Sequence, residues 1–160
     1  MRQNKIRLYA HFVWSTWNRQ PLITEAIESD LYRFIQGICL DHRCAVLAIG
    51  GMPDHVHLLV ALSNTITVAD LMEFVKGGFS RFVTERLLHE EWFKWQGSYG
   101  VFSVSPQDKN KVIRYIQNQK QHHADGTVWT HAEETFQTTD SGLAVVTASP
   151  TQVGEEPKAS

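Results

Sequence analysis

Two histidines separated by a single residue are the first candidates for chemistry in this chain. His55 and His57 lie in an alternating stretch after Gly50-Gly51 and Pro53, a pattern typical of a β-strand that follows a tight turn. Alternate side chains of a strand leave the same face, so the two imidazoles should lie side by side, with backbones roughly 6.6 Å apart. Such a pair can chelate one cation if a third group completes the site and leaves positions open for substrate. In the alternative, one histidine is a core residue and the other points at solvent.

A tyrosine and a glutamine near residue 120 could complete such a site. Tyr115 and Gln119 are four residues apart in a segment with helical periodicity, so they should be neighbours on one helical face, and His123 continues the same stripe. A phenol with a pKa of about 10 is a poor nucleophile, so a metal or a base must activate it before it can form a covalent intermediate. In the alternative, Tyr115 packs in the core and Gln119 is solvated. His122 and His123 could orient the site or simply end the helix favourably as cations.

The elements around these residues predict an α+β fold. Strands are expected over residues 6–15, 45–49, 55–62 and 99–105, and helices are expected after Thr24, Thr67 and Ser105. The second helix should bend at Gly77-Gly78, and the third should start with Ser105 as N-cap and Pro106 at the first helical position, then run to about His123. This order is that of a ferredoxin-like split βαβ antiparallel sheet with helices on one face, plus an additional C-terminal helix that carries the tyrosine.

Composition and charge indicate one catalytic domain followed by an acidic tail. The 160 residues are 42% hydrophobic, which suits a single compact domain. Residues 1–123 carry 14 Lys and Arg against 11 Asp and Glu, a net charge of +3, whereas residues 124–160 carry one lysine against six acids, a net charge of −5. The domain is therefore assigned to residues 1–123, and residues 124–160, which lack sustained periodicity, are expected to form a divergent and largely disordered tail.

The sequence also limits the location of the protein. No run approaches the roughly 18 to 20 consecutive apolar residues of a membrane helix, and the N-terminus lacks the apolar stretch of a signal peptide. A cytoplasmic protein without membrane association is therefore expected. Cys39 and Cys44 form no C-x-x-C pair and are expected to be reduced core thiols.

Several segments of the chain recur together in one known family. They are His11-Phe12-Val13-Trp14-Ser15-Thr16 with Asn18-Arg19, the stretch from Gly50 to Val60 that contains the histidine pair, Phe93-Lys94-Trp95-Gln96, residues 99–105, and Tyr115-Ile116-Gln117-Asn118-Gln119 followed by His122-His123. This combination resembles the single-tyrosine HUH transposases of simple insertion sequences and their REP-associated relatives. The resemblance covers about residues 6–123, and the chain departs from it after about Ala124.

The resemblance implies a chemistry for the residues already singled out. His55 and His57 would bind a divalent metal ion, Mg²⁺ or Mn²⁺, together with Gln119, and Tyr115 would attack a DNA phosphorus. The implied product is a 5′-phosphotyrosine with a free 3′-hydroxyl, and strand transfer is the reverse attack on that linkage. No nucleotide hydrolysis is needed, which agrees with the lack of a G-x-x-x-x-G-K-[ST] loop.

The resemblance further implies a substrate and an assembly. The substrate would be single-stranded DNA at the hairpin ends of a mobile element. The assembly would be a homodimer that joins two sheets edge to edge, in which the tyrosine helix can serve the metal site of the partner.

Contacts to DNA outside the site are less specific. Arg19, Lys76, Ser80 and Arg81 could contact phosphates or form a solvated polar face, and Trp92, Phe93, Trp95 and Tyr99 could stack unpaired bases or form core and interface. Three other functions stay open: a non-catalytic or domesticated DNA-binding relative, a ferredoxin-like module that binds single-stranded nucleic acid, and a metal-dependent hydrolase that uses water.

Overall fold

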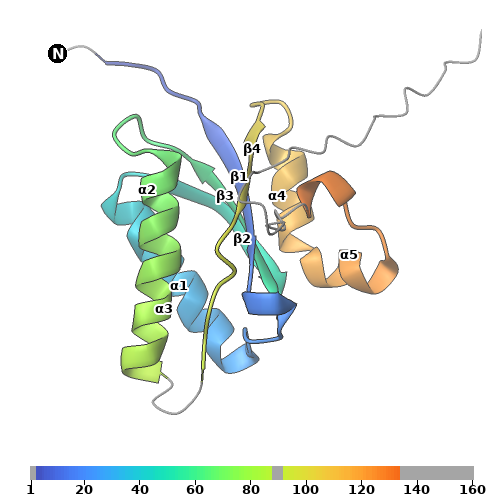
Figure 1. Cartoon of the computed structure of the whole chain (residues 1–160). Helices are drawn as coiled ribbons and strands as arrows, with labels where there is room; N and C mark the ends of the chain where they lie inside the picture. The colour runs from blue at the N-terminus through green and yellow to red at the C-terminus, as the bar shows by residue number, and fades with distance from the viewer. Residues whose placement is uncertain (1–2, 88–91, 134–160) are drawn as a thin grey trace, which may run out of the picture.

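Four antiparallel strands form one sheet in the computed structural model, which describes residues 3–87 and 92–133 (Figure 1). The strands are β1 (Tyr9–Ser15), β2 (Ala45–Met52), β3 (His55–Ala61) and β4 (Gly100–Val104), in the order β2-β3-β1-β4. β3 and β1 are the two central strands, so the predicted histidine strand lies inside the sheet. The predicted α+β fold with a split βαβ antiparallel sheet is confirmed.

The pairing of β2 with β3 differs from the prediction at the turn. The sequence predicts that Gly50-Gly51 and Pro53 close the first strand of the hairpin, but both glycines pair within the strand, Gly50 opposite His57 and Gly51 opposite Val56. The turn is formed by Pro53, as predicted, and Asp54. β2 is therefore three residues longer than predicted, and its glycines lie beside the histidine pair.

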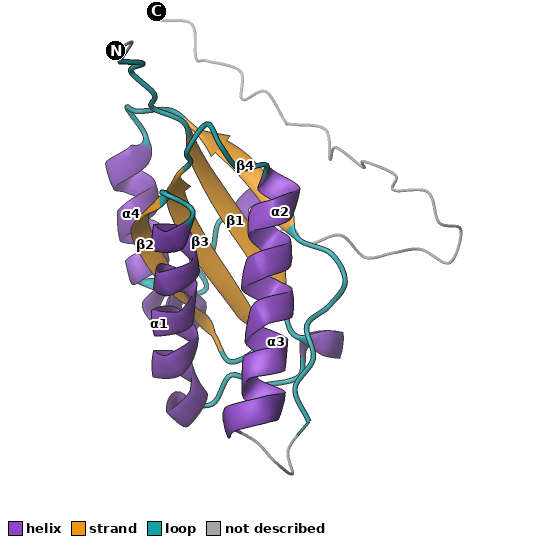
Figure 2. Cartoon of the chain, turned by 90° about the vertical axis from the view of Figure 1, so that its left-hand side faces the viewer, coloured by secondary structure: helices purple, strands orange, loops and turns teal. Residues whose placement is uncertain are grey.

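Helices cover both faces of the sheet. One face packs against α1 (Glu25–Asp41) and a long helix that begins at residue 68, and their contact is the larger hydrophobic core, with Phe12, Trp14 and Leu58 fully buried in it (Figure 2). The opposite face carries His11, His55 and His57 and is covered by the C-terminal helices, which form a smaller core around Leu59 and Ile116. The alternation of strand side chains thus separates the main core from the histidine face.

The long helix continues through the two glycines where a bend was predicted. It comprises α2 (Val68–Met72), the π-helical turn η2 (Glu73–Gly77), α3 (Gly78–Phe82) and a second π-helical turn η3 (Val83–Leu87). Thr67 caps it, since its hydroxyl accepts a hydrogen bond from the backbone N–H of Asp70 at 3.0 Å. Gly77 and Gly78 both keep helical backbone angles. The predicted bend is therefore wrong, and the irregularity is present as π-helical turns.

The predicted third helix starts later than expected and is interrupted. Ser105 accepts a hydrogen bond from Asp108 N–H at 3.2 Å, but residues 106–108 form a turn. The helix α4 runs over Lys109–Gln117 and α5 over Gln119–Asp125. Between them Asn118 leaves helical geometry, with φ −106° and ψ 25°. Gly126, in the left-handed region with φ 66°, ends α5.

Residues 124–133 do not behave as the tail that was predicted to begin at residue 124. After α5 the chain turns back toward α4 and forms the short helix η4 (Thr130–Ala132), in which Ala132 is buried against the smaller core. We call residues 127–133 the closing segment. The prediction for residues 134–160 lies outside the described residues.

Two smaller expectations concern the cysteines and the membrane. Cys39 and Cys44 are both free and buried, as expected for core thiols. Among the residues that the structure describes, no helix is long and apolar enough to cross a membrane.

Candidate active site

The histidine pair lies on the face of β3 that α4 covers. His55 and His57 are 1% and 0% exposed, and their ring centroids are 5.1 Å apart with the rings nearly perpendicular. Both side chains leave the same face of the strand, as the alternation predicts. The alternative in which one of them points at solvent is thereby excluded.

Two further side chains fix the orientation of the pair. Nδ1 of His55 donates a hydrogen bond to the Asp54 carboxylate at 2.7 Å, and Nδ1 of His57 shares a hydrogen bond with Nε2 of His11 at 2.9 Å. The Nε2 atoms of His55 and His57 therefore both point into the same space. Partners of this kind set the tautomer and ring orientation of metal-binding histidines. Arg19, predicted as a DNA contact, lies behind this layer with its Nε 3.5 Å from Asp54.

The two imidazoles differ in charge. Burial lowers the pKa of His57, which favours the neutral form. Burial also acts on His55, but the hydrogen bond that it donates to the Asp54 carboxylate and its ion pair with the Glu133 carboxylate outweigh burial and raise the pKa of His55 to about 9. Burial, together with the nearby His57, lowers the pKa of His11 to about 3. The side chains of the site therefore include one charged imidazole between two carboxylates.

Tyr115 projects from α4 toward the histidines of its own chain. Its ring is buried, perpendicular to the His57 ring at a centroid distance of 5.8 Å, and stacked on Trp129 at 4.0 Å. The hydroxyl oxygen accepts a hydrogen bond from Trp129 N–H at 3.1 Å, and the hydroxyl donates to Oε1 of Glu133. Burial and the Glu133 carboxylate raise the pKa of Tyr115 to about 12, although hydrogen bonds from Gln119 and Trp129 act in the opposite direction. The phenol is neutral in this state.

Gln119 reaches the same site from the other side of the helix interruption. It is 1% exposed, its Nε2 donates to the carbonyl oxygen of Tyr115 at 3.4 Å, and its Oε1 is buried with no hydrogen-bond partner among the described residues. The two residues are therefore neighbours, as predicted from their spacing, but they belong to two helices separated by Asn118. The alternative in which Gln119 is solvated is excluded.

Glu133 is the residue of the site that sequence reasoning missed. Its two carboxylate oxygens lie 3.2 Å from Nε2 of His55 and 3.2 Å from Nε2 of His57, and Oε2 lies 3.7 Å from Nε2 of His123. Burial alone would raise the pKa of Glu133, but the two histidines hold it well below its usual range. Glu133 follows the predicted domain boundary, and only Trp129, an aromatic residue in a stretch of low complexity, signals that this region packs on the domain.

The donor set of the site suits a divalent cation. One nitrogen each from His55 and His57 and one oxygen from Glu133 lie within 4.8 Å of one another. Within residues 3–87 and 92–133, these nitrogens, Oε2 of Glu133 and Oε1 of Gln119 are buried atoms that meet no partner with hydrogen-bond geometry, although the ion-pair distances are short. Buried polar atoms are rarely left unsatisfied in proteins. A cation bound among them would satisfy all four.

The remaining candidate residues are divided between the two faces of the sheet. His123 lies against His55 at a ring centroid distance of 5.0 Å, so it borders the site, whereas His122 packs against Tyr115 and bonds Thr127 at 2.9 Å. Lys76, Ser80 and Arg81 lie on the long helix, across the sheet from the site (Figure 2). Lys76 donates to the carbonyl oxygens of Gln96 and Ser98 at 2.7 and 3.0 Å, and burial lowers its pKa to about 8. In this structure the Lys76 ammonium therefore holds the backbone of residues 96–98 in place.

The aromatic cluster after residue 90 is mostly core. Phe93 and Trp95 are buried, and Phe93 packs edge to face with both Trp95 and Phe79, while Trp92 remains 54% exposed. Of the two interpretations of this cluster, core packing therefore holds for Phe93 and Trp95.

Comparisons with known proteins identify related sequences and structures. A family model described as IS200-like transposase matches residues 4–119. ISDra2 transposase TnpA of Deinococcus radiodurans is 26% identical over 118 residues, which span 71% of this chain and 84% of that protein.

Two solved structures have the same fold. A crystal structure of a candidate transposase from Deinococcus radiodurans R1 has a TM-score of 0.60 and 24% identity, and covers 74% of this chain and 98% of its own. A REP-associated tyrosine transposase bound to a REP hairpin has a TM-score of 0.59 and 17% identity, with 80% of this chain and 74% of that chain covered. These structural similarities show the fold alone. The family model matches residues 4–119, well over half of the sequence. The chain therefore belongs to the IS200-like transposase family.

Proposed function

We propose that this transposase cleaves and rejoins single-stranded DNA through a covalent bond between Tyr115 and a 5′ phosphate. The observation that carries this function is the position of the Tyr115 hydroxyl, which donates to Glu133 and accepts from Trp129 N–H while its ring lies against His57 of the same chain. A tyrosine that merely packs in a core needs one hydrogen-bond partner, whereas this hydroxyl contacts a donor and a carboxylate that itself contacts the histidine pair.

The same cluster would hold a divalent metal ion, Mg²⁺ or Mn²⁺. His55, His57 and Gln119 would bind it, and Glu133 would add a carboxylate oxygen. Amide and carboxylate oxygens favour these harder ions, whereas the imidazoles alone would suit zinc equally well. When bound, the cation supplies positive charge that offsets Glu133, lowers the pKa of the phenol and polarises the phosphate.

The chain's own residues would then carry the reaction as follows. The Tyr115 hydroxyl, which donates to Glu133, transfers its proton to that carboxylate, and the Tyr115 oxygen attacks the phosphorus. The bond from this oxygen to the 5′ phosphate forms, the bond from phosphorus to the 3′ oxygen breaks, and the 3′ oxygen takes up a proton to leave a free 3′-hydroxyl. Trp129 N–H and the Gln119 amide, which both lower the pKa of the phenol, stabilise the phenolate before attack. Rejoining is the reverse attack by a 3′-hydroxyl, so one phosphodiester replaces another.

The proposed substrate is single-stranded DNA that forms hairpins at the ends of a mobile element. A relative with the same fold is described as bound to a REP hairpin. A homodimer is proposed as well, because β2 and β4 are both edge strands and Val101 on β4 is 39% exposed. Edge strands with free backbone groups readily pair with another chain.

One experiment separates this function from its alternatives. An internally labelled single-stranded DNA hairpin is incubated with the protein and Mn²⁺, and both cleavage and protein-linked label are measured after denaturation. Cleavage together with linked label supports the tyrosine mechanism. Cleavage without linked label would make water the nucleophile, and binding without cleavage would favour a non-catalytic relative.

A further inference from the structure

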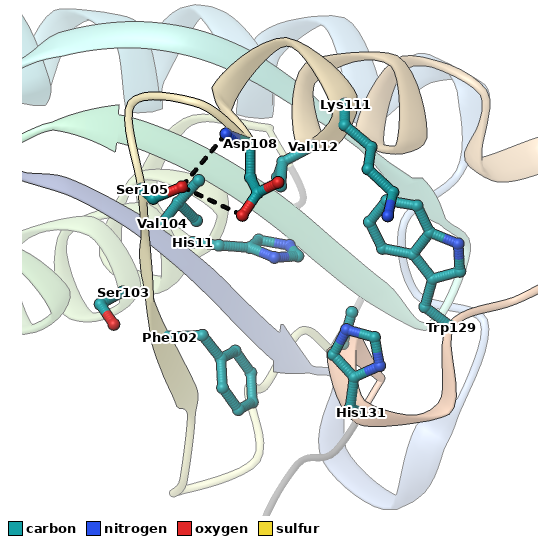
Figure 3. Close-up of a pocket in the computed structure, with 11 residues that line it drawn as sticks. His11, Phe102, Ser103, Val104, Ser105, Asp108, Lys111, Val112, Trp129 and His131 are labelled. Atoms are coloured by element: carbon teal, nitrogen blue, oxygen red, sulfur yellow. Dashed lines mark hydrogen bonds between the residues drawn. The ribbon is translucent and has the colours of Figure 1, made fainter. Parts of the chain in front are cut away.

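A cavity of about 320 Å³ opens beside the active site (Figure 3). Its walls come from four parts of the fold: His11 of β1, β4 and the turn after it, the start of α4, and the closing segment. This volume is near the lower end of the roughly 300–1,000 Å³ range of small-ligand sites, so it suits one compact group.

The cavity is connected to both halves of the active site. His11 lies in it, and the same imidazole shares a hydrogen bond with His57. Trp129 forms another wall, and its ring is stacked on Tyr115 with the planes only 9° apart. A group in the cavity would therefore be one side chain away from the nucleophile and one side chain away from the metal-binding pair.

The lining of the cavity suits a flat aromatic ring. Phe102 and His131 face it from opposite sides in Figure 3, and the rings of Trp129 and His131 are nearly parallel, with centroids 6.0 Å apart. Lys111 lies at the rim, where its Nζ is 5.3 Å from the Trp129 ring centroid. Aromatic walls with a cation at the edge are the combination by which proteins bind unpaired bases of a single strand.

A carboxylate at the rim gives the cavity a chemical preference. Ser105 donates a hydrogen bond to Oδ2 of Asp108 at 3.0 Å, and within the described residues Oδ1 has no hydrogen bond. A free carboxylate oxygen accepts from the exocyclic amino group of cytosine, whereas thymine presents an acceptor oxygen at that position, which a carboxylate repels.

We propose that this cavity binds one unpaired DNA base with an exocyclic amino group, from the nucleotide next to the phosphate that Tyr115 attacks; this inference rests on the function proposed above. Phe102, Trp129 and His131 stack on the base, Asp108 accepts from its amino group, and Lys111 neutralises a neighbouring phosphate.

Binding of two homopolymers tests the base preference. The full chain is titrated into fluorescently labelled oligodeoxycytidylate and oligothymidylate of equal length, and both dissociation constants are measured by anisotropy. The wild type should bind the cytidine strand about tenfold more tightly, the scale of one stacked and recognised base. Asp108→Asn should abolish this preference while thymidine binding is retained. Phe102→Leu, which keeps an apolar side chain and removes the ring, should weaken cytidine binding more than thymidine binding.

A control variant and a cross-linking readout complete the test. Asn110→Ala changes an exposed residue of α4 outside the cavity and should bind both strands like the wild type. A strand with 5-iodocytidine, after irradiation, should cross-link to Phe102, Trp129 or His131. Equal affinity of the wild type for both strands, an equal loss for both strands in the two cavity variants, or cross-links confined to other surfaces would overturn the inference.

The outcome is independent of the proposed reaction. A protein that forms the covalent adduct but shows no base preference lacks the base site and keeps the tyrosine mechanism. A protein that shows the preference and its loss in Asp108→Asn, yet forms no adduct, has the base site without that mechanism.

Discussion

A single methyl group added at Gly50 should disturb the active site without touching any of its functional side chains. Gly50 of β2 pairs with His57 of β3, and the backbone of Ile116 on α4 rests directly on Gly50. A Cβ at this position would overlap the carbonyl oxygen of Ile116 and lie 3.3 Å from its carbonyl carbon. Neither backbone can yield as a flexible side chain would, so α4 must move away by a distance on the order of 1 Å to restore normal contact.

This movement has a predicted size in two measurements. Overpacking of this kind costs about 1–3 kcal/mol of unfolding free energy, which corresponds to a Tm lowered by roughly 3–10 °C for a chain of this length. Because Tyr115 precedes Ile116, the same movement shifts the nucleophile relative to His57, and a displacement of about 1 Å can reduce the rate about 100-fold. At a temperature at which the Gly50→Ala protein is still fully folded, its cleavage rate should therefore be lower than that of the wild type.

Gly37 provides the matched control. It lies in the interior of α1, is exposed, and a Cβ built there meets nothing within 4 Å. Gly37→Ala should therefore stabilise the protein by about 0.5–1 kcal/mol and leave cleavage unchanged. Thermal unfolding and single-turnover cleavage of both variants check the prediction. A Gly50→Ala protein with wild-type Tm and wild-type rate would refute the close approach of α4 to β2.

Three further predictions concern the cation site and its assembly. Mn²⁺ should raise the Tm of the wild type, and EDTA should abolish cleavage. Glu133→Ala should bind Mn²⁺ at least about tenfold more weakly than the wild type. An unchanged or higher Mn²⁺ affinity in that variant would show that Glu133 is not a ligand. The pKa of His55 is raised to about 9, so its stabilising contact with Asp54 and Glu133 should be fully present below about pH 6.5 and lost as pH rises through about 9 in protein without Mn²⁺. The affinity for Mn²⁺ should rise over the same interval, because the metal binds the neutral imidazole. Calorimetric titrations that give the same Mn²⁺ affinity at all pH values would contradict this prediction. Because Tyr115 faces the histidines of its own chain, mixing Tyr115→Phe with His57→Ala protein should not restore cleavage, and rescue by mixed dimers would show that the tyrosine serves the partner's site.

The parts of this site that sequence could predict are those set by local periodicity. The alternation of β3 places His55 and His57 on one face, and a spacing of four residues makes Tyr115 and Gln119 neighbours even across the interruption at Asn118. Both relations depend on the backbone alone.

The parts that sequence did not predict depend on contacts between distant segments. Gly50 resembles a turn residue until the backbone of α4 is seen to lie on it. Glu133 is 18 residues beyond Tyr115 in the chain, in a stretch with no periodicity, and reaches the site only because Trp129 stacks on the tyrosine ring. The charge of His55 likewise follows from two carboxylates that no short motif brings together.

The covalent step at Tyr115 is the central claim, and one comparison tests it most directly. Wild type and Tyr115→Phe are incubated with a labelled single-stranded hairpin and Mn²⁺, and binding is measured beside label that stays on the protein after boiling in detergent. The substitution removes one oxygen and keeps the ring that packs on Trp129, so binding should remain near wild type, because affinity comes mostly from phosphate contacts and base stacking. The wild type should form an adduct linked through a 5′ phosphate, and Tyr115→Phe should form none. An adduct of equal yield in Tyr115→Phe, or cleavage by the wild type with no adduct at all, would contradict the account.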